Sequence, residues 1–283
     1  MKKKRRRKKS RRKLSKQQYT AIALCLLTAV TICAYSLFKY ADRQCRAYLG
    51  KPLSYELIKQ QVGPMTGDSK LPEGNWSYGI DISHHQPIVN WINLKVYVDR
   101  KGRTVWSLRN AVRIESVDYV IMKATEGGDF KDNRFKDRWV KAETFGYKRG
   151  AYHFFRPGKS AKVQAENYIN TVGRIKRHDF APILDIEKTD GQSKTVINQR
   201  VLEWLKIVEK HYGRKPIIYA NPYYLNTILS SEIIENYPIW VANYATSKPS
   251  YPRWHMWQFT DKGIVRGVGR VDLNVCPKDS ALL

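Results

Sequence analysis

The sequence predicts an α/β fold, a closed barrel of β/α units, with one transmembrane helix in front of it. At least seven short apolar runs alternate with amphipathic stretches of helical length, which is typical of β/α units around a parallel sheet. So many runs within about 200 residues favour a barrel over an open sheet. Near the N-terminus, twenty residues without a charge are long enough to cross a bilayer as a helix.

The N-terminal region is predicted to be a membrane anchor. Residues 1–18 form a basic tail, with twelve Lys and Arg and no acid among the first sixteen positions. The uncharged span 19–38 follows at once, and the corresponding stretch beyond it holds only four basic residues. The positive-inside rule therefore predicts a cytoplasmic tail and a single-pass protein of the cell membrane whose remaining chain is extracytoplasmic. A cleaved signal peptide is the alternative, but the long basic head and the missing A-x-A site disfavour it.

Residues 39–75 are predicted to be a linker or stalk, because segment 63–74 holds three Gly and two Pro. The barrel is then predicted to occupy residues 76–283. The formal net charge of +26 is concentrated in the basic tail, which alone could bind nucleic acid. Next to a membrane span, such a tail lies against anionic lipid headgroups, so no nucleic-acid partner is predicted. The sequence does not indicate the oligomeric state.

Each predicted strand is an apolar run followed by polar residues. Amphipathic helices are predicted at 135–145, 160–175 and 194–212. The segment NLKVYVDRKGRTVWSLRN interrupts the alternation, since VYV and TVW flank the turn-like DRKG, and it predicts a hairpin inserted on the barrel rim at 95–106. The strand runs are YGIDIS (78–83), DYVIMKAT (118–125), RGAYHFF (149–155), APILDIE (181–187), KPIIYAN (215–221), PIWVANY (238–244) and WHMWQFT (254–260).

Cysteine and histidine give little chemical information. Cys45 and Cys276 would both lie in an oxidising compartment and could form a disulfide, although spacing cannot show that they meet. His84, His85 and His153 lack the H-E-x-x-H spacing of a metal site. The sequence also holds no glycine-rich nucleotide fingerprint. Because both signals are missing, neither a metal nor a cofactor is predicted.

The run APILDIEK ends in two acids, Asp185 and Glu187, separated by Ile186. In a strand, residues two apart point to the same face, and barrel chemistry lies at the C-terminal ends of strands. Two neighbouring carboxylates do not both ionise freely, so one pKa should rise and supply a proton donor near neutral pH. Paired carboxylates on a barrel indicate glycoside hydrolysis. A surface edge or a salt-bridge network is the alternative reading of this motif.

Two further acids and several aromatic residues lie at similar strand ends. Asp81 follows an apolar start in YGIDISHHQ, and Asp272 lies between apolar neighbours in VGRVDLNV. An aromatic-lined acidic cleft suits a sugar chain, because pyranose faces stack on rings, although a single aromatic residue belongs more often to a core. The aromatic residues at strand ends are Tyr152, Phe154, Tyr219, Trp240, Tyr244 and Trp257.

At this point the chain resembles the glycoside hydrolase family 25 lysozymes, which are N-acetylmuramidases. The resemblance covers residues 78–275 and rests on GIDISHHQ, VIMKATEGGDFKDNRF, GAYHFF, PILDIE, PIIYAN, PIWVANY, MWQF and VDLN, in that order. It implies a flattened TIM-like barrel finished by antiparallel strands. It also implies cleavage of the β-1,4 bond between N-acetylmuramic acid and N-acetylglucosamine in peptidoglycan, for cell-wall turnover or remodelling.

Carried over by motif, Glu187 is the expected general acid, Asp185 its partner, and Asp81 and Asp272 complete the acidic cluster. The substrate's acetamido group is expected to attack the sugar carbon, while a carboxylate nucleophile and inversion remain open. A chitinase-like glycosidase and a non-catalytic peptidoglycan-binding protein are the alternatives. The expected substrate-binding residues are Lys123, Tyr152, Phe154, Tyr219, Asn221, Trp240, Trp257 and Gln258.

Overall fold

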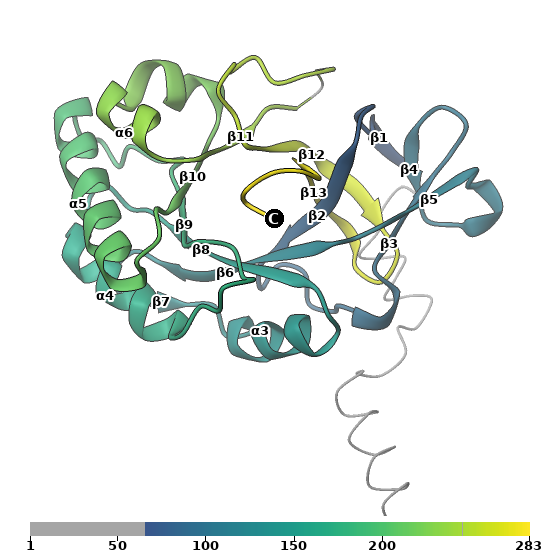
Figure 1. Cartoon of the computed structure of the whole chain (residues 1–283), viewed down its shortest axis with the longest axis horizontal. Coiled ribbons are helices and arrows are strands. Elements are labelled where there is room, and N and C mark those ends of the chain that lie inside the picture. The colour runs from purple at the N-terminus through teal and green to yellow at the C-terminus, as the bar shows by residue number, and fades with distance from the viewer. Residues whose placement is uncertain (1–65, 245) are drawn as a thin grey trace, which may run out of the picture. The chain divides into compact units, whose positions relative to one another are not determined.

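The structure is a computed structural model of the chain, and it describes residues 66–244 and 246–283 (Figure 1). The predicted tail, the span 19–38 and most of the predicted linker lie outside the described residues, so the anchor stays a prediction. Among the helices that are described, none combines the length and the apolar character required to cross a membrane.

Eight strands close into a barrel of mixed orientation, because the first strand pairs with both the second and the last. All neighbouring strands run parallel except β13, which is antiparallel to both β12 and β2. The predicted parallel barrel with an antiparallel finish is therefore confirmed. The strands are β2 (Trp76–Ile82), β6 (Tyr119–Glu126), β8 (Lys148–Phe154), β9 (Ile183–Asp185), β10 (Ile217–Ala220), β11 (Ile239–Ala242), β12 (Met256–Val265) and β13 (Gly269–Pro277). A short strand, β7 (Phe130–Lys131), pairs antiparallel with β6.

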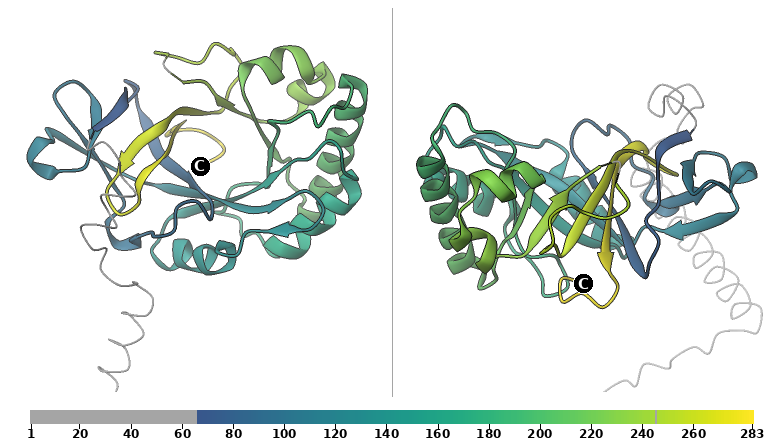
Figure 2. Two further views of the ribbon diagram at one scale, coloured as in Figure 1. Left: turned by 180° about the vertical axis from the view of Figure 1, so that it is seen from behind. Right: turned by 90° about the horizontal axis from the view of Figure 1, so that it is seen from above.

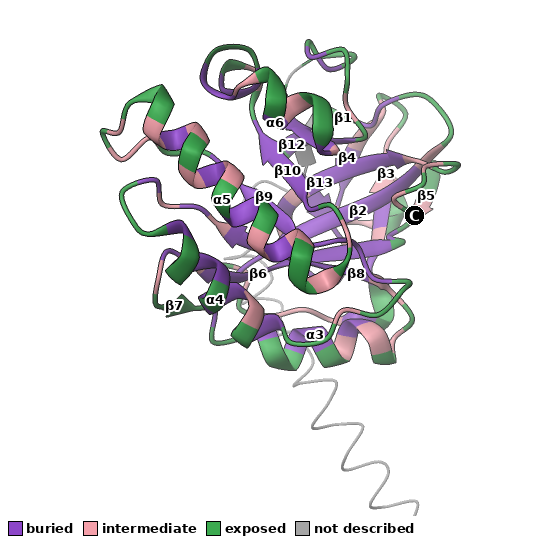
Figure 3. Ribbon diagram, turned by 60° about the vertical axis from the view of Figure 1, so that its left-hand side comes forward, coloured by how far each residue is buried: buried purple, intermediate pink, exposed green. Residues whose placement is uncertain are grey.

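Helices cover the outside of the parallel strands, with their apolar faces inward and their exposed faces outward (Figures 1 and 3). The three predicted helices are confirmed as α3 (Phe135–Thr144), α4 (Ala161–Val172) and α5 (Lys194–Tyr212), and α6 (Ser231–Asn236) follows. Ser160 and Ser193 cap α4 and α5 through side-chain hydrogen bonds to the backbone three residues on.

The hydrophobic core has two layers, because side chains alternate between the two faces of each strand. The barrel interior holds one cluster, to which Ile121 and Ile183 belong. A larger cluster, which includes Val120 and Leu184, fills the space between the strands and the helices. Cys276 lies in the interior cluster as a buried free thiol, whereas Cys45 lies outside the described residues.

The predicted hairpin is confirmed and belongs to a small second sheet beside the barrel (Figure 2). The hairpin strands β3 (Lys95–Val98) and β4 (Arg103–Val105) lie between β5 (Arg113–Ser116) and β1 (Thr66–Lys70). Strand β1 falls within the predicted linker, and its sequence TGDSK was not recognised because it lacks an alternating apolar pattern. The sheet is tied to the end of β12, since the Ile264 amide donates to Oγ1 of Thr104 at 2.9 Å.

A buried ion cluster lies near the N-terminal ends of the barrel strands. Arg149, the second residue of β8, is 3% exposed and makes a bidentate contact with Asp179, with Nε–Oδ1 at 2.8 Å and Nη2–Oδ2 at 3.1 Å. Its Nη1 also contacts Oε2 of Glu143 at 2.9 Å, and its guanidinium lies 4.2 Å from the centre of the Trp139 ring. Every charge in this cluster therefore has a partner.

Candidate active site

The opposite end of the barrel carries a pocket with a cavity volume of 260 Å³, lined by side chains from the C-terminal ends of the strands. All four acids expected from the sequence line this one pocket: Asp81 on β2, Asp185 and Glu187 at the end of β9, and Asp272 on β13. The structure therefore brings the four acids together in space, although they span most of the barrel sequence.

Asp185 and Glu187 face the pocket in different environments. Strand β9 ends at Asp185, but the Ile186 amide still donates to the Tyr219 carbonyl at 2.9 Å. The side chain of Ile186 is buried in the outer core. The alternation therefore continues for two residues beyond the strand. Asp185 is 7% exposed, whereas Glu187 is exposed at the mouth. The Tyr224 hydroxyl donates to the Glu187 carbonyl at 2.8 Å and fixes this turn.

The expected rise in pKa falls on Asp185. Burial raises the pKa of Asp185 well above its ordinary value, and the neighbouring charge of Glu187 raises it further. Oδ1 of Asp185 is buried and has no hydrogen-bond partner in the described part of the chain. A buried carboxyl oxygen without a donor is costly, so this atom is suited to receive a donor from a bound ligand.

Asp81 and Asp272 form a hydrogen-bonded carboxyl pair. They lie opposite each other on β2 and β13. Oδ2 of Asp81 accepts from Nε2 of Gln258 at 2.8 Å and from Nδ2 of Asn274 at 2.7 Å, which favours its charged form although burial raises its pKa. Burial and the charge of Asp81 raise the pKa of Asp272 to about 9, so Asp272 holds the proton between them.

Neutral polar side chains support this pair. Asn274 also accepts a hydrogen bond from Nε1 of Trp240 at 3.0 Å, and Gln258 accepts one from the Tyr219 hydroxyl at 2.7 Å. The Tyr244 hydroxyl donates to the same Gln258 oxygen. Asn274 was not expected from the sequence, although it lies two residues after Asp272 on one strand and so on the same face. That spacing is the signal that could have identified it.

Another part of the pocket lining combines aromatic rings with one cation. Tyr152 and Phe154 lie two apart on β8 and both line the pocket, as expected. Lys123 on β6 places Nζ 4.8 Å from the centre of the Phe154 ring and 2.6 Å from Oε2 of Glu126. Burial opposes ionisation of Glu126, but Lys123 and Arg156 outweigh it and lower the pKa of this carboxyl.

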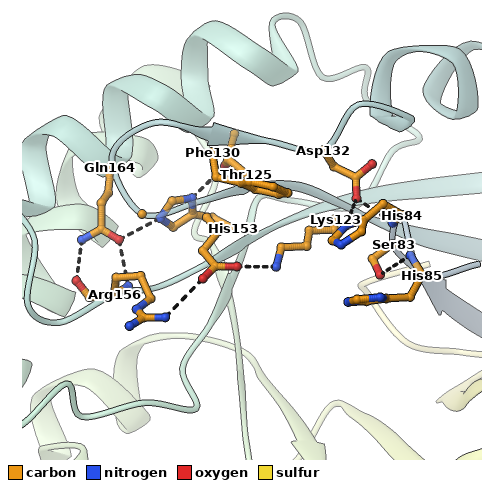
Figure 4. Close-up of polar contacts among 12 residues, drawn as sticks. Ser83, His84, His85, Lys123, Thr125, Phe130, Asp132, His153, Arg156 and Gln164 are labelled. Atoms are coloured by element: carbon orange, nitrogen blue, oxygen red, sulfur yellow. Dashed lines mark hydrogen bonds and ion pairs between the residues drawn. The ribbon is translucent and has the colours of Figure 1, made fainter.

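The loop after β2 supplies His85 and Gln86 to the pocket. Asp132 holds this loop, since its Oδ2 accepts from the His84 amide at 2.7 Å and lies 3.1 Å from Nδ1 of the ring (Figure 4). Arg138 donates to the Ser83 carbonyl at 2.6 Å from the other side. Within residues 66–244 and 246–283, no group of three or more His, Cys, Asp and Glu side chains is arranged to hold a metal ion.

His153 is a core residue. Burial lowers its pKa to about 4, and its ring lies between Oγ1 of Thr125 at 2.7 Å and Oε1 of Gln164 at 3.1 Å (Figure 4). The ring also stacks on Trp204 with centres 5.6 Å apart. A neutral imidazole that bridges a strand and a helix stabilises the fold and lies apart from the pocket lining.

Two of the expected substrate-binding residues do not reach the pocket. Trp257 directly precedes Gln258 on β12, so it points to the outer face, where Nε1 donates to the Asn243 carbonyl at 2.7 Å. Asn221 follows the end of β10, and its side chain accepts from the Tyr224 amide at 3.0 Å as a local cap. The other six residues, Lys123, Tyr152, Phe154, Tyr219, Trp240 and Gln258, line the pocket as expected.

Comparison with known proteins adds to this geometry. The chain matches the profile of Glycosyl hydrolases family 25 over residues 80–268. It is 36% identical over 209 residues to the uncharacterized protein YegX of Escherichia coli K12, which covers 73% of this chain and 71% of that protein. It is 30% identical over 212 residues to lysozyme M1 of Streptomyces globisporus, covering 69% and 66%. The bacterial lysozyme structure from Streptomyces coelicolor gives a TM-score of 0.60 at 29% identity, covering 74% and 95%.

Proposed function

Because this chain belongs to glycosyl hydrolase family 25 and is a lysozyme-like peptidoglycan hydrolase, we propose that it is an N-acetylmuramidase. In this proposal it cleaves the β-1,4 bond between N-acetylmuramic acid and N-acetylglucosamine. The observation that carries it is one pocket in which four acids face the aromatic rings of Tyr152, Phe154, Tyr219 and Trp240. Rings bind the faces of pyranose sugars, and the acids supply the proton chemistry of glycoside cleavage.

The test is mass spectrometry of peptidoglycan digested by the purified full-length protein in detergent. A new reducing end on N-acetylmuramic acid is the expected result. A reducing end on N-acetylglucosamine would contradict the proposed bond. Binding to peptidoglycan with no cleavage would support the non-catalytic alternative, and cleavage of chitin oligosaccharides at a comparable rate would support the chitinase-like one.

The positions of the two acids at the end of β9 support different roles for them. Glu187 is exposed, so it can give its proton to the leaving oxygen and then accept one from the attacking water. Asp185 is buried with an unpaired oxygen, which the N–H of a 2-acetamido group would satisfy. Held in this way, the acetamido oxygen bonds to the sugar carbon as the glycosidic bond breaks, and water then opens the cyclic intermediate with retention.

Azide distinguishes this mechanism from a direct carboxylate nucleophile. The Asp185→Ala variant should lose most activity, and added azide should not restore it, because the missing group only orients the acetamido group. If Asp185 were the nucleophile, azide would occupy its place and leave a glycosyl azide product. Recovery of activity with that product would refute substrate assistance.

We further propose that residues 19–38 anchor the enzyme in the cell membrane with the tail inside and the hydrolase domain on the cell-wall side. The support is the sequence alone, with twelve basic residues in front of an uncharged span. Protease added to intact spheroplasts should digest the C-terminal domain, and the membrane-bound protein should keep its original N-terminus. A mature chain that starts beyond residue 38 would identify the span as a cleaved signal peptide.

A further inference from the structure

A second groove, with a cavity volume of 820 Å³, lies beside the catalytic pocket. One wall comes from the end of β1 and the residues after it, a second from the outer end of β12, and a third from the segment after β11. The wall at residues 70–73 precedes residue 80, where the match to the family begins. The residues that decide its chemistry are Lys70, Leu71, Glu73, Tyr244, Phe259 and Asp261.

Tyr244 separates the groove from the catalytic pocket. Its side chain lines the groove and is 39% exposed, while its hydroxyl donates to Gln258, which lines the catalytic pocket. Asp261 of the groove is also near the carboxyl pair, because its charge helps to raise the pKa of Asp272. Tyr244 and Asp261 are therefore the two lining residues that connect the groove to the catalytic pocket.

The lining of the groove differs from that of the pocket. Its apolar part consists of Leu71, Pro72 and Phe259, and Phe259 is only 3% exposed, so Tyr244 is the one aromatic side chain of this lining whose ring is open to a ligand. Its lining carries charges of both signs, from the acidic Glu73 and Asp261 and the basic Lys70 and Lys262. A volume of this size, in the usual range of about 300–1,000 Å³, holds a short ligand. Mixed charge over an apolar floor suits a peptide better than a glycan.

We propose that this groove binds the stem peptide that the peptidoglycan sugar in the catalytic pocket carries. The inference rests on the proposed muramidase function. The stem peptide is attached to the lactyl group of N-acetylmuramic acid and holds both carboxylates and amines. Once the sugar occupies the pocket, the peptide is tethered next to the groove, so even weak contacts act at high effective concentration. The groove thus favours peptide-bearing strands over bare ones.

The experiment compares two forms of one substrate with the full-length protein in detergent. Soluble glycan strands that carry stem peptides are compared with the same strands after an amidase has removed the peptides, and kcat/KM is measured from new reducing ends. The wild type should prefer the peptide-bearing strands about tenfold, which corresponds to about 1.4 kcal/mol. Lys70→Glu and Glu73→Lys should each lower that preference severalfold, with kcat/KM on bare strands unchanged.

Lys101→Glu is the matched control, because Lys101 is exposed on the hairpin of the same small sheet and lies outside the groove lining. It should keep the wild-type preference. Equal kcat/KM of the wild type on both substrates would overturn the groove proposal and leave the muramidase function intact. An equal loss of kcat/KM on both substrates in Lys70→Glu and Glu73→Lys would also overturn the groove proposal. No cleavage of either substrate would overturn the muramidase function, and this inference with it.

Discussion

Arg149 and Asp185 are both buried charged residues in neighbouring strands of one barrel, but they lie near opposite ends. Near the N-terminal end, Arg149 has Asp179 and Glu143 within 2.9 Å and an aromatic ring against its guanidinium. Near the C-terminal end, Asp185 shares its pocket with three other acids, and its Oδ1 has no partner among the described residues. The N-terminal end therefore pairs its buried arginine with opposite charges, whereas the C-terminal end places four acids in one pocket.

The difference separates two uses of a buried charge. A paired charge is costly to disturb because removal of one partner leaves the other buried and alone, so the N-terminal cluster contributes to stability. Buried carboxyl groups next to one another are costly as they stand, and burial first and the neighbouring acids second raise the pKa values of Asp185 and Asp272. The C-terminal end therefore holds unpaired buried acids in a pocket at the expense of stability, which is typical of a functional site.

The largest expected effect is on activity at the C-terminal end. Glu187→Gln keeps the shape of the side chain but removes its proton, so turnover on peptidoglycan should fall about 10²- to 10⁴-fold. Because Glu187 is exposed, the free energy of unfolding should change by no more than about 0.5 kcal/mol. Turnover and urea unfolding measured on the same preparation check both parts. Near wild-type turnover would move the proton donor to another carboxyl of the pocket.

The opposite result is expected at the N-terminal end. Asp179→Asn removes one partner of Arg149, and the free energy of unfolding should fall by about 3–5 kcal/mol. Activity per folded molecule should stay close to wild type, because the pair lies away from the pocket lining. Asp137→Asn, which removes an exposed carboxylate that pairs with Lys141, is the control and should cost less than about 1 kcal/mol. A similar cost for both variants would contradict the comparison.

The sequence predicted the catalytic end better than the stabilising end for a physical reason. Acids at the ends of parallel strands meet at one edge of a barrel whatever their separation in the chain, so Asp81 and Asp185 could be grouped in advance. Asp272 joins them from the antiparallel β13, where it lies opposite Asp81. Arg149 on β8 pairs with Asp179 in the connection between α4 and β9, through side chains whose directions depend on packing, and no pattern indicates such a pair. Strand β1 was also missed, because TGDSK has no apolar alternation.

Strand parity explains where the expectations for the pocket failed. Trp257 and Gln258 are consecutive on β12, so the barrel can turn only one of them inward. Trp257 was expected in the pocket because it is aromatic, but the register of β12 decides which side chain points inward. The parallel pairing aligns Gln258 with Ala242 and Trp257 with Val241. Asn274 shares a strand face with Asp272, but its hydrogen bond to Asp81 depends on the register of β13 against β2, which the sequence does not state.

An effect that is smaller per pH unit is expected on the pH dependence of stability. The folded state raises the pKa of Asp272 from 3.8 to about 9, so between these values it holds a proton that the unfolded chain has lost. The stability that the folded state gains from this bound proton is fully present below pH 3.8 and is lost as the pH rises towards about 9. One proton corresponds to at most about 1.4 kcal/mol per pH unit. Asp272→Asn has no such proton to lose.

The stability of Asp272→Asn relative to wild type should therefore rise with pH between about 4 and 9, as measured by urea unfolding at several pH values. The difference between the two proteins cancels the titration of groups that they share. A difference that stays constant with pH would show that Asp81 and Asp272 do not hold a shared proton in the folded state.

The smallest expected effect tests strand parity at the pocket wall. Tyr219→Phe removes the hydroxyl that donates to Gln258 at 2.7 Å. One such hydrogen bond contributes about 0.5–1.5 kcal/mol, so kcat/KM should fall roughly two- to tenfold. Trp257→Phe instead removes packing and a hydrogen bond on the outer face, so it should lower stability and leave kcat/KM unchanged below the melting temperature. The reverse outcome, with substrate affinity lost only in Trp257→Phe, would return Trp257 to the substrate site and contradict the register of β12.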